Sequence, residues 1–573
     1  MIETLTPGLI LIVGALLIPL LPRRLQPGLA VALPVVSFLQ LLTLEPGLSH
    51  QLRLFDYELT VVRVDRLSLV FGYIFHLAAF LAAIYALHVK DTVQHVAAMI
   101  YVGAAVGAVF AGDLITLFVY WELTAVSSVF LVWASRTEAA YRSGMRYLVI
   151  QVGSGVLLLA GVILHASATG SIAFGQLIGD DGLLSSASAG VVLIFLAFGV
   201  KAAFPFLHNW LQDAYPNGTV TGTVFLSAFT TKLAIYALAR GFAGTEILIP
   251  MGVVMTLFPV VYAVIENDLR KVLAYSLNNQ LGYMVVGIGI GTALSLNGTV
   301  SHAFAHILYK ALLFMTMGAV LYRTGTIKAT ELGGLYKSMP VTTVCCLIAA
   351  ASISGFPFFS GFVTKSMVIS AVEHHHMTWI FIGLLVASAG VMEHSGIKIP
   401  YFAFFAHDSG LRVKEAPWNM LVAMVAGAAL CLFIGLFPAP LYSILPFPVG
   451  DYEPYTAGHV LTSFQLLVFA IFAFAVLVRT GIYPPEKAGI NLDFDWTYRK
   501  MLPALIRKIA AVVRRFTEGF SIVAGVLLGR AYRLVYRFHG PTGVFARTWS
   551  TGAIAFWAVL GLFGFLLLYY WGR

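Results

Sequence analysis

The fold is decided by one stretch, Ser301-His-Ala-Phe-Ala-His-Ile-Leu-Tyr-Lys-Ala-Leu-Leu-Phe-Met-Thr-Met-Gly-Ala-Val-Leu-Tyr-Arg323. It is long and apolar enough to span a membrane as one helix, which takes about 20 residues. Within it His302, His306 and Lys310 recur every four residues, so they share one helical face. Ionisable side chains are costly at membrane depth and normally mark the path of an ion. The stretch therefore predicts a spanning helix that helps to move an ion; the alternative is a purely structural role for the two histidines.

The composition of the whole chain agrees with a membrane protein. Of its 573 residues, 59% are apolar and only 11% are charged, against roughly 25% charged in an ordinary soluble domain. A soluble protein cannot hide that much apolar surface, because its outside must carry charge. A soluble enzyme, a disordered chain and a nucleic-acid-binding protein are therefore disfavoured. The net charge of +9 is the excess expected in the cytoplasmic loops of a membrane protein.

Apolar windows recur along the entire chain, and about sixteen of them are long enough for transmembrane helices. We therefore expect an all-α polytopic membrane protein. The one long polar interval is 481–550. The windows are 5–22, 27–44, 66–88, 95–111, 113–134, 145–166, 188–207, 220–241, 248–265, 271–293, 301–323, 342–372, 377–396, 417–437, 461–480 and 551–571.

The charges between these windows alternate in sign. Basic residues such as Arg23, Arg136 and Lys398 follow odd-numbered windows, whereas acidic residues such as Glu373 and Asp451 follow even-numbered ones. Because basic loops tend to stay in the cytoplasm, this pattern places the odd-numbered loops there and the N-terminus outside. We expect a multi-pass protein of the bacterial inner membrane.

The interval 481–550 has a different pattern. From about Leu502 to Phe538 basic and apolar residues alternate at helical spacing, and Gly540-Pro541 ends the run. This is typical of an amphipathic helix that lies on the membrane, its basic side toward anionic lipid headgroups. The alternative is a short membrane span at Phe520–Leu528. The basic residues are Arg507, Lys508, Arg514, Arg515, Arg530, Arg533 and Arg537.

Four more charged residues stand where lipid is expected: Glu122, Lys201, Lys232 and Lys365. Near a helix end a lysine can instead reach the interface without any function, and Glu122 could be only a structural partner of a lysine. A buried ammonium favours its neutral form because it loses hydration, and a nearby carboxylate opposes that change. Such groups, linked by water, can pass protons. Together with the stripe at 302–310 they predict a proton relay.

Prolines interrupt two of the apolar windows, in Phe204-Pro-Phe206 and in Phe356-Pro-Phe358. Proline lacks a backbone donor and breaks a helix. Lys201 lies near the first break and Lys365 near the second. One broken helix in each half of the chain is typical of ion sites in transporters built from inverted repeats. We therefore expect two such repeats.

Other chemistry finds little support in the sequence. No Gly-rich phosphate loop and no nucleophile with its base stands at a suitable position. The three adjacent residues His374-His375-His376 cannot all face one metal on a regular helix. We expect no cofactor and no metal. Glu393 and His394, near the end of the window 377–396, are candidate residues of an exit from the relay.

Six motifs carry a resemblance to a known family. They are Tyr120-Trp-Glu-Leu123, Lys201-Ala-Ala-Phe-Pro-Phe-Leu-His-Asn-Trp-Leu-Gln-Asp-Ala214, Asn267-Asp-Leu-Arg-Lys-Val-Leu-Ala-Tyr-Ser276, Leu281-Gly-Tyr283, His302-Ala-Phe-Ala-His-Ile-Leu-Tyr-Lys-Ala-Leu-Leu-Phe314 and Ser354-Gly-Phe-Pro-Phe-Phe-Ser-Gly-Phe-Val-Thr-Lys365. With them the chain resembles the proton-conducting antiporter-like family, shared by Mrp-type Na+/H+ antiporters and the membrane arm of respiratory complex I. The resemblance covers residues 60–480, and the run 396–410 is most similar to the branch of D-type Mrp subunits.

The resemblance implies a role for each relay residue. Two inverted five-helix units would hold an essential ion pair, Glu122 and Lys201, in the first half and a terminal group, Lys365, in the second. Lys232 would pass protons from the first half to the central residues of the 301–323 stretch. Relatives often carry an acid after the terminal lysine. This chain has Ser366 there, so its exit would run through Glu393 or elsewhere.

The expected division of the chain follows the same resemblance. A lateral helix followed by a last span is similar to the distal subunit of complex I. The expected parts are N-terminal transmembrane helices (1–94), a first antiporter-like repeat (95–245), a second repeat (246–400), C-terminal transmembrane helices (401–480), a cytoplasmic-side amphipathic lateral helix (481–550) and a final transmembrane helix (551–573).

The first hypothesis is a secondary transporter: the proton-translocating subunit of a multisubunit Na+/H+ antiporter. Its partners would be other membrane subunits, H+, Na+ and, at the lateral helix, anionic lipids; no nucleic acid is expected. A second hypothesis is the proton-pumping arm of a complex I-like or hydrogenase redox complex. A third is the membrane subunit of an energy-coupled inorganic-carbon uptake system. A scaffold with an inactive channel is disfavoured by the intact Glu122, Lys201 and Lys310.

Overall fold

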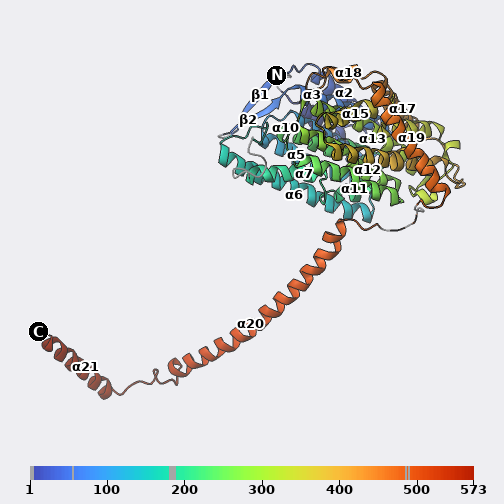
Figure 1. Ribbon diagram of the computed structural model, residues 1–573. Coiled ribbons are helices and arrows are strands. Elements are labelled where there is room, and N and C mark those ends of the chain that lie inside the picture. Colours follow the sequence, from blue (N-terminus) through green and yellow to red (C-terminus); the bar gives the residue numbers. More distant parts are fainter. Residues whose placement is uncertain are drawn as a thin grey trace. The chain divides into compact units, whose positions relative to one another are not determined.

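The computed structural model describes residues 5–572 apart from 55–56, 180–188, 484–486, 488 and 490. The chain divides into two compact units, Met1–Asn491 and Leu492–Arg573. Both are mainly helical (Figure 1). Among the described residues, eleven helices are long and apolar enough to cross a membrane. The all-α polytopic class is therefore confirmed, whereas the number of sixteen spans stays a prediction.

Short 3₁₀ turns join several helices of the first unit. The helices of this unit pack side by side (Figure 1). They are α1 (Pro7–Leu17), α2 (Gln26–Leu41), α3 (Arg66–Tyr85), α4 (Thr92–Phe110), α5 (Leu114–Trp133), α6 (Glu138–Thr169), α7 (Ala189–Ala202), α8 (Asn209–Ala214), α9 (Gly222–Ala228), α10 (Thr230–Gly241), α11 (Leu248–Ile265), α12 (Leu269–Ile290), α13 (Ala293–Thr324), α14 (Pro340–Ser354), α15 (Ser360–His374), α16 (Thr378–Val391), the π-helical segments η5 (Met392–Lys398) and η6 (Tyr401–Phe405), α17 (Trp418–Leu436), α18 (Ala439–Ser443) and α19 (Ala457–Arg479).

Helix ends follow ordinary capping chemistry. The Asp113 carboxylate accepts a hydrogen bond from the backbone N–H of Thr116 at the start of α5, and Asp268 does the same for two N–H groups at the start of α12. Such caps satisfy donors that the first helical turn leaves without partners. At the other end, α13 stops at Gly325, whose φ of 76° is left-handed and suits glycine.

Helix α13 is the core of the unit. Every residue from Ser295 to Val320 is buried. The stripe at 302–310 therefore lies inside protein rather than against lipid, as expected for ionisable groups at membrane depth.

The predicted helix breaks are present. A break separates α7 from α8 around Pro205, and another separates α14 from α15 around Pro357. The window 342–372 is thus divided where its proline predicts, because proline cannot supply an N–H inside the run. After each proline a phenylalanine adopts a positive φ, 69° at Phe206 and 75° at Phe358. This shared conformation supports the inverted repeats, which remain a prediction.

A small sheet adds to the helical class. Strands β1 (Ser49–Leu54) and β2 (Tyr57–Arg63) pair antiparallel, with Leu52 opposite Leu59. The sequence analysis missed this hairpin, because it contains no long apolar run. Polar and apolar residues alternate through it, as they do in strands with one exposed face.

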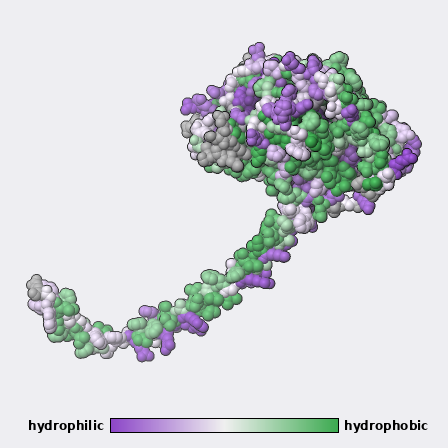
Figure 2. Space-filling view, in the orientation of Figure 1, coloured by the Kyte–Doolittle hydropathy of each residue, from purple (hydrophilic) through white to green (hydrophobic). Residues whose placement is uncertain are grey.

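The second unit consists of the π-helical turn η7 (Thr497–Met501), α20 (Leu502–His539) and α21 (Thr551–Trp571). The predicted amphipathic helix is thus one continuous helix of 38 residues. Figure 2 shows that hydrophobic and hydrophilic residues both occur along α20. Helix α21 is among the eleven that could cross a membrane, and α20 is not. That α20 lies on anionic lipid stays a prediction.

Candidate functional site

The stripe on α13 points into a polar interior. His302, His306 and Lys310 have no exposed surface. His302 is held at both ring nitrogens: Nδ1 lies 3.1 Å from the Thr364 hydroxyl, and Nε2 lies 3.2 Å from the Gln280 side-chain oxygen. These two bonds fix its ring between α15 and α12.

The next two members of the stripe are held less tightly. Among the described residues, neither ring nitrogen of His306 has a hydrogen-bond partner, and neither does the Lys310 ammonium nitrogen. The charges of Lys232 and Lys365 also act on the His306 ring. Buried polar groups normally have partners in protein or water. His306 and Lys310 thus bring nitrogens that can bind or release a proton into the interior.

Lys232 lies at a helix break that the sequence analysis did not expect. Helices α9 and α10 are separated at Phe229, which releases carbonyl groups from the helical ladder. The fully buried Lys232 ammonium donates a hydrogen bond to one of them, the Ser227 carbonyl, at 2.6 Å. Its charge acts on both His306 and Lys310. The structure thus brings Lys232 to the central stripe.

Glu122 and Lys201 form a second cluster, on α5 and α7. The Lys201 ammonium donates to the Trp121 carbonyl and the Thr124 hydroxyl, each at 2.6 Å, and lies 4.2 Å from the centre of the Trp121 ring. The Glu122 and Lys201 charges act on each other. Glu122 Oε1, however, is buried and has no hydrogen-bond partner within the part of the chain that the structure describes. The predicted partnership is thus electrostatic, and the direct bonds of the lysine go to neutral oxygens.

Gly155 makes room for the Glu122 carboxylate. A Cβ atom at this position would lie 1.3 Å from Glu122 Oε1. Any side chain there would therefore displace the carboxylate, so the sequence of α6 is fitted to the position of Glu122.

Hydroxyl groups lie between the two clusters. The Ser128 and Tyr147 hydroxyls are 2.7 Å apart, and the Tyr101 hydroxyl lies 2.6 Å from that of Thr230. Tyr147 is also close to Thr230. Ser128 is one helical turn beyond Thr124, and Thr230 is two residues before Lys232. Sequence reasoning missed this bridge, because tyrosine is common in apolar helices; nothing in the spacing distinguished these residues.

Lys365 lies at the other side of the stripe. Its ammonium donates to the Ile353 carbonyl at 3.1 Å and to the Ser388 hydroxyl at 3.5 Å, and it lies 5.2 Å from the Tyr283 ring centre. Its charge acts on His302. It lines a cavity, whose volume is about 320 Å³.

The candidate exit residues lie elsewhere. Glu393 accepts a hydrogen bond from the Tyr483 hydroxyl at 2.7 Å. His394 Nδ1 lies 2.8 Å from the Ser395 hydroxyl, and the charge of Lys310 acts on the ring. Neither Glu393 nor His394 lines the Lys365 cavity. The charges of Lys398 and Lys365 act on the same ring, and the exit role of Glu393 and His394 stays a prediction.

Lys398 corrects the analysis of loop charges. It was expected in a cytoplasmic loop, yet it is fully buried. Its ammonium donates to the Ala263 carbonyl at 3.2 Å and to the Glu266 carbonyl at 2.8 Å. A cation at the C-terminus of α11 satisfies carbonyls that the helix leaves without partners, so Lys398 is a cap.

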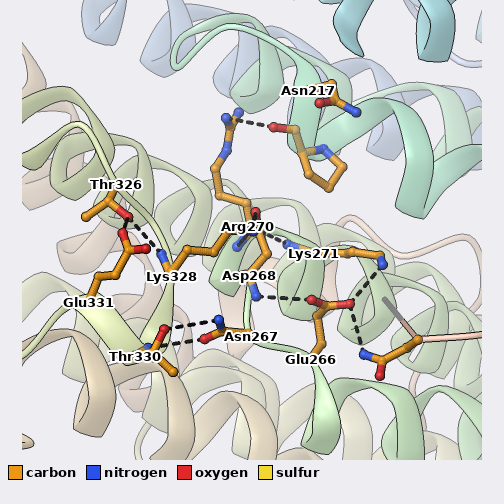
Figure 3. Close-up of polar contacts among 12 residues, drawn as sticks. Asn217, Glu266, Asn267, Asp268, Arg270, Lys271, Thr326, Lys328, Thr330 and Glu331 are labelled. Carbon is orange, nitrogen blue, oxygen red and sulfur yellow. Dashed lines mark hydrogen bonds and ion pairs between the residues drawn. The ribbon is translucent and has the colours of Figure 1, made fainter. Parts of the chain in front are cut away.

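Polar residues join α11, α12 and the loop after α13 (Figure 3). The guanidinium of Arg270 donates to the Pro216 carbonyl at 3.0 Å and so ties α12 to the chain before α9. Asp268 accepts from Lys328 at 3.0 Å. Burial opposes ionisation of Glu266, but the Lys271 ammonium at 2.8 Å, the backbone N–H of Asp268 and the Asn491 amide together outweigh it and hold the pKa of this carboxyl below its ordinary value.

The described residues contain no group of three or more His, Cys, Asp or Glu side chains that could hold a metal ion. The buried groups found here are instead lysines, histidines, one carboxylate, hydroxyls and amides. That set can bind and release protons.

Comparison with known proteins gives the chain a family. The protein family described as "NADH:quinone oxidoreductase/Mrp antiporter, TM" matches residues 111–392 of this chain. The chain is 31% identical over 352 residues to the D-type Na+/H+ antiporter subunit of Alkalihalophilus pseudofirmus, covering 59% of this chain and 71% of that protein. It is 30% identical over 520 residues to the A-type antiporter subunit of the same organism, covering 79% of this chain and 64% of that protein. The chain thus spans just under two thirds of the A-type relative.

Other similar chains come from a hydrogenase, from an Mrp complex and from a respiratory membrane complex. Hydrogenase-4 component B of Escherichia coli is 26% identical over 423 residues, covering 67% of this chain and 63% of that protein. A chain of the Mrp complex from Dietzia matches with a TM-score of 0.69 at 21% identity, over 83% of this chain and 99% of that one. A chain of an archaeal membrane-bound sulfane sulfur reductase matches with a TM-score of 0.70 at 21% identity, over 98% and 99%. These structural matches establish a shared fold.

Proposed function

Because the chain belongs to the NADH:quinone oxidoreductase/Mrp antiporter transmembrane family, we propose that it is the proton-translocating subunit of a multisubunit Na+/H+ antiporter. Its partners would be the other membrane subunits of that complex. The names of its relatives support the transported ions, H+ and Na+. In this proposal the N-terminus is outside and the bacterial inner membrane is the location.

One observation carries the proposal: the buried ionisable groups form a series through the bundle. Glu122 and Lys201 act on each other, Lys232 acts on the α13 stripe, and Lys365 acts on its first histidine. The four lysines of this series, Lys201, Lys232, Lys310 and Lys365, are buried. Charges so placed are costly, so they normally mark an ion path. A series of them supports proton transfer over a distance that no single group covers.

The proposed mechanism uses changes of protonation along this series. A proton held near Glu122 and Lys201 passes through the hydroxyl bridge to Lys232 and then to His306 and Lys310. Each protonation repels the next positive charge, because charges interact strongly in a medium of low dielectric constant. Each arriving proton therefore favours release of the next one from Lys365.

A second candidate function rests on the extent of one structural match. The sulfane sulfur reductase chain matches 98% of this chain, so the match includes most of Leu492–Arg573. The Dietzia Mrp chain matches 83%. The proton-pumping arm of a respiratory redox complex is therefore the alternative. The same relay would operate, and partner subunits would supply the electrons.

The test is cation-induced collapse of a pH gradient in inverted membrane vesicles that contain the full complex. Wild type is compared with Lys310→Ala and with Lys337→Ala, a control at an exposed loop lysine. We expect Na+ to collapse the gradient in wild type and in the control, and Lys310→Ala to lose the effect at equal expression. If no monovalent cation moves protons in wild type, the antiporter proposal is wrong and an electron donor has to be sought.

A further inference from the structure

The cavity beside Lys365 is one of two that meet. It lies between α15, α16 and α19 and has a volume of about 320 Å³. A second cavity of about 730 Å³ lies beyond it, at the end of α15 and the start of α19. The residues common to both are Ser370, Glu373, Thr456 and His459. The two cavities therefore adjoin each other, and a relay lysine lines the first of them; together they are called the passage below.

The second cavity, called the vestibule below, is rich in charge. Glu373, Asp451 and Glu453 line it, together with His374 and His376. These residues are exposed, with Asp451 and Glu453 in the segment before α19. Acidic walls concentrate cations, including protons, near a surface.

Hydroxyl groups and apolar side chains share the walls of the Lys365 cavity, the apolar ones including Phe362, Phe381 and Leu466. Seryl and threonyl hydroxyls line the cavity next to Lys365: Ser354, Ser366, Ser370, Ser388, Thr462 and Ser463. The Tyr452 hydroxyl donates to Ser366 at 2.8 Å. The hydroxyl-bearing part of a space of this size offers water molecules partners on the walls.

His459 stands where the cavities meet, and its bonds fix its tautomer. Nδ1 faces two backbone carbonyls, those of Glu453 at 3.2 Å and Pro454 at 3.3 Å. Carbonyl oxygens only accept, so Nδ1 carries the hydrogen of the neutral ring. Nε2, 3.1 Å from the Ser370 hydroxyl, is then the acceptor. The basic nitrogen of His459 therefore faces the passage.

On the basis of the proposed function, we propose that protons leave the relay from Lys365 through these two cavities, with His459 as the carrier between them. The Lys365 ammonium gives one proton to water in the first cavity. His459 Nε2 takes a proton from that water and gives it to water in the vestibule, and each group returns to its starting state. Neither Glu393 nor His394 lines either cavity, so this route differs from the exit suggested by the sequence.

The first test measures access to water and does not depend on transport. Thr462 lines the Lys365 cavity, whereas Phe469, at an exposed position on the same apolar helix, does not line it and is expected to face lipid. The native cysteines Cys345, Cys346 and Cys431 are buried. In the full complex, a membrane-impermeant thiol reagent should label Thr462→Cys from the vestibule side and leave Phe469→Cys unlabelled. Absence of labelling at 462 from that side would overturn the route.

The second test measures the carrier. His459→Gln should slow cation-driven proton movement about tenfold, because cavity water can replace only part of a positioned proton carrier. His375→Gln is the matched control, since His375 lies near the vestibule but lines neither cavity, and it should transport like wild type. Full transport by His459→Gln would overturn its role. Labelling at 462 without any cation-driven proton movement in wild type would instead contradict the proposed function and leave the water route standing.

Discussion

The two broken helices share a motif but differ in what surrounds their lysines. In both, a Phe-Pro-Phe sequence breaks the helix, and Phe206 and Phe358 take the same left-handed conformation. Lys201, before the first break, is enclosed and feels the charge of Glu122. Both lysines bond directly to two neutral oxygens, but Lys365, after the second break, lines a cavity.

The difference between these regions suggests different tasks for one motif. A carboxylate in a medium of low dielectric constant holds an ammonium in its charged form, whereas neutral oxygens hold it less strongly. The first half is therefore suited to keeping a proton, and the second half to releasing one into water.

The largest expected effect comes from removing the carboxylate that distinguishes the halves. Glu122→Gln keeps the shape of the side chain and removes its charge. We expect cation-driven proton movement to fall roughly 100-fold, the scale of losing a positioned proton-transfer group. Gradient collapse in vesicles measures it. Glu138→Gln, at an exposed carboxylate on α6, is the control and should transport normally. Wild-type rates in Glu122→Gln would contradict the proposed difference between the two halves.

A smaller effect should follow from giving the second half a carboxylate. Ser366→Asp places a negative charge in the cavity beside Lys365. We expect transport to slow about tenfold, because about 1.4 kcal/mol of attraction is enough to delay proton release by that factor. Ser366→Asn has similar shape without charge and should be nearly neutral. Equal rates in the two variants would argue against release from Lys365.

The shared backbone conformation predicts matched changes in stability. A β-branched side chain is poorly tolerated at positive φ. Phe206→Val and Phe358→Val should each destabilise the protein by roughly 1–3 kcal/mol, seen as a lower unfolding temperature of the purified complex. Phe206→Leu and Phe358→Leu, which are not β-branched, serve as controls. If leucine and valine act alike, strain at these positions is not the cause.

The smallest effect concerns the polar loop that joins the halves. The pKa of Glu266 lies below its ordinary value of 4.5, so its contribution to stability is present above that pH and is lost as the pH falls through the lower, folded-state value. The contribution should be under about 1 kcal/mol, since Lys271 is partly exposed. Thermal unfolding of Glu266→Gln should depend less on acid than that of wild type. If the unfolding temperatures of wild type and Glu266→Gln fall equally on acidification, this prediction is contradicted.

Much of the architecture could be predicted because membrane helices follow simple rules of length and hydropathy. The breaks at Pro205 and Pro357 followed from the missing backbone donor, and the α13 stripe followed from its four-residue spacing. The hairpin at 49–63 could not be predicted from apolar length, which is what the windows measure. Lys398 was assigned to a loop because charge alone does not distinguish a loop residue from a buried cap.

The candidate site was only partly visible in the sequence. Lysines and histidines at membrane depth stand out because of their cost. Gln280, which holds His302, and Tyr147, which bridges the clusters, depend on contacts between helices distant in sequence. One signal was available: Asn278-Asn279-Gln280 places three amides in succession inside an apolar helix. His459 carried no such signal, since its role depends on two cavities that only the folded chain creates.

The central claim is that the two halves form one path in series. The direct measurement is the rate of cation-driven proton movement for Glu122→Gln, Lys365→Met and the double variant, at equal expression in vesicles holding the full complex. In a series, blocking either half stops the flow, so each single variant should lose nearly all transport and the double variant should be no slower than the slower single one. If each single variant keeps about half the wild-type rate and only the double variant loses it, the halves work in parallel and the claim is contradicted.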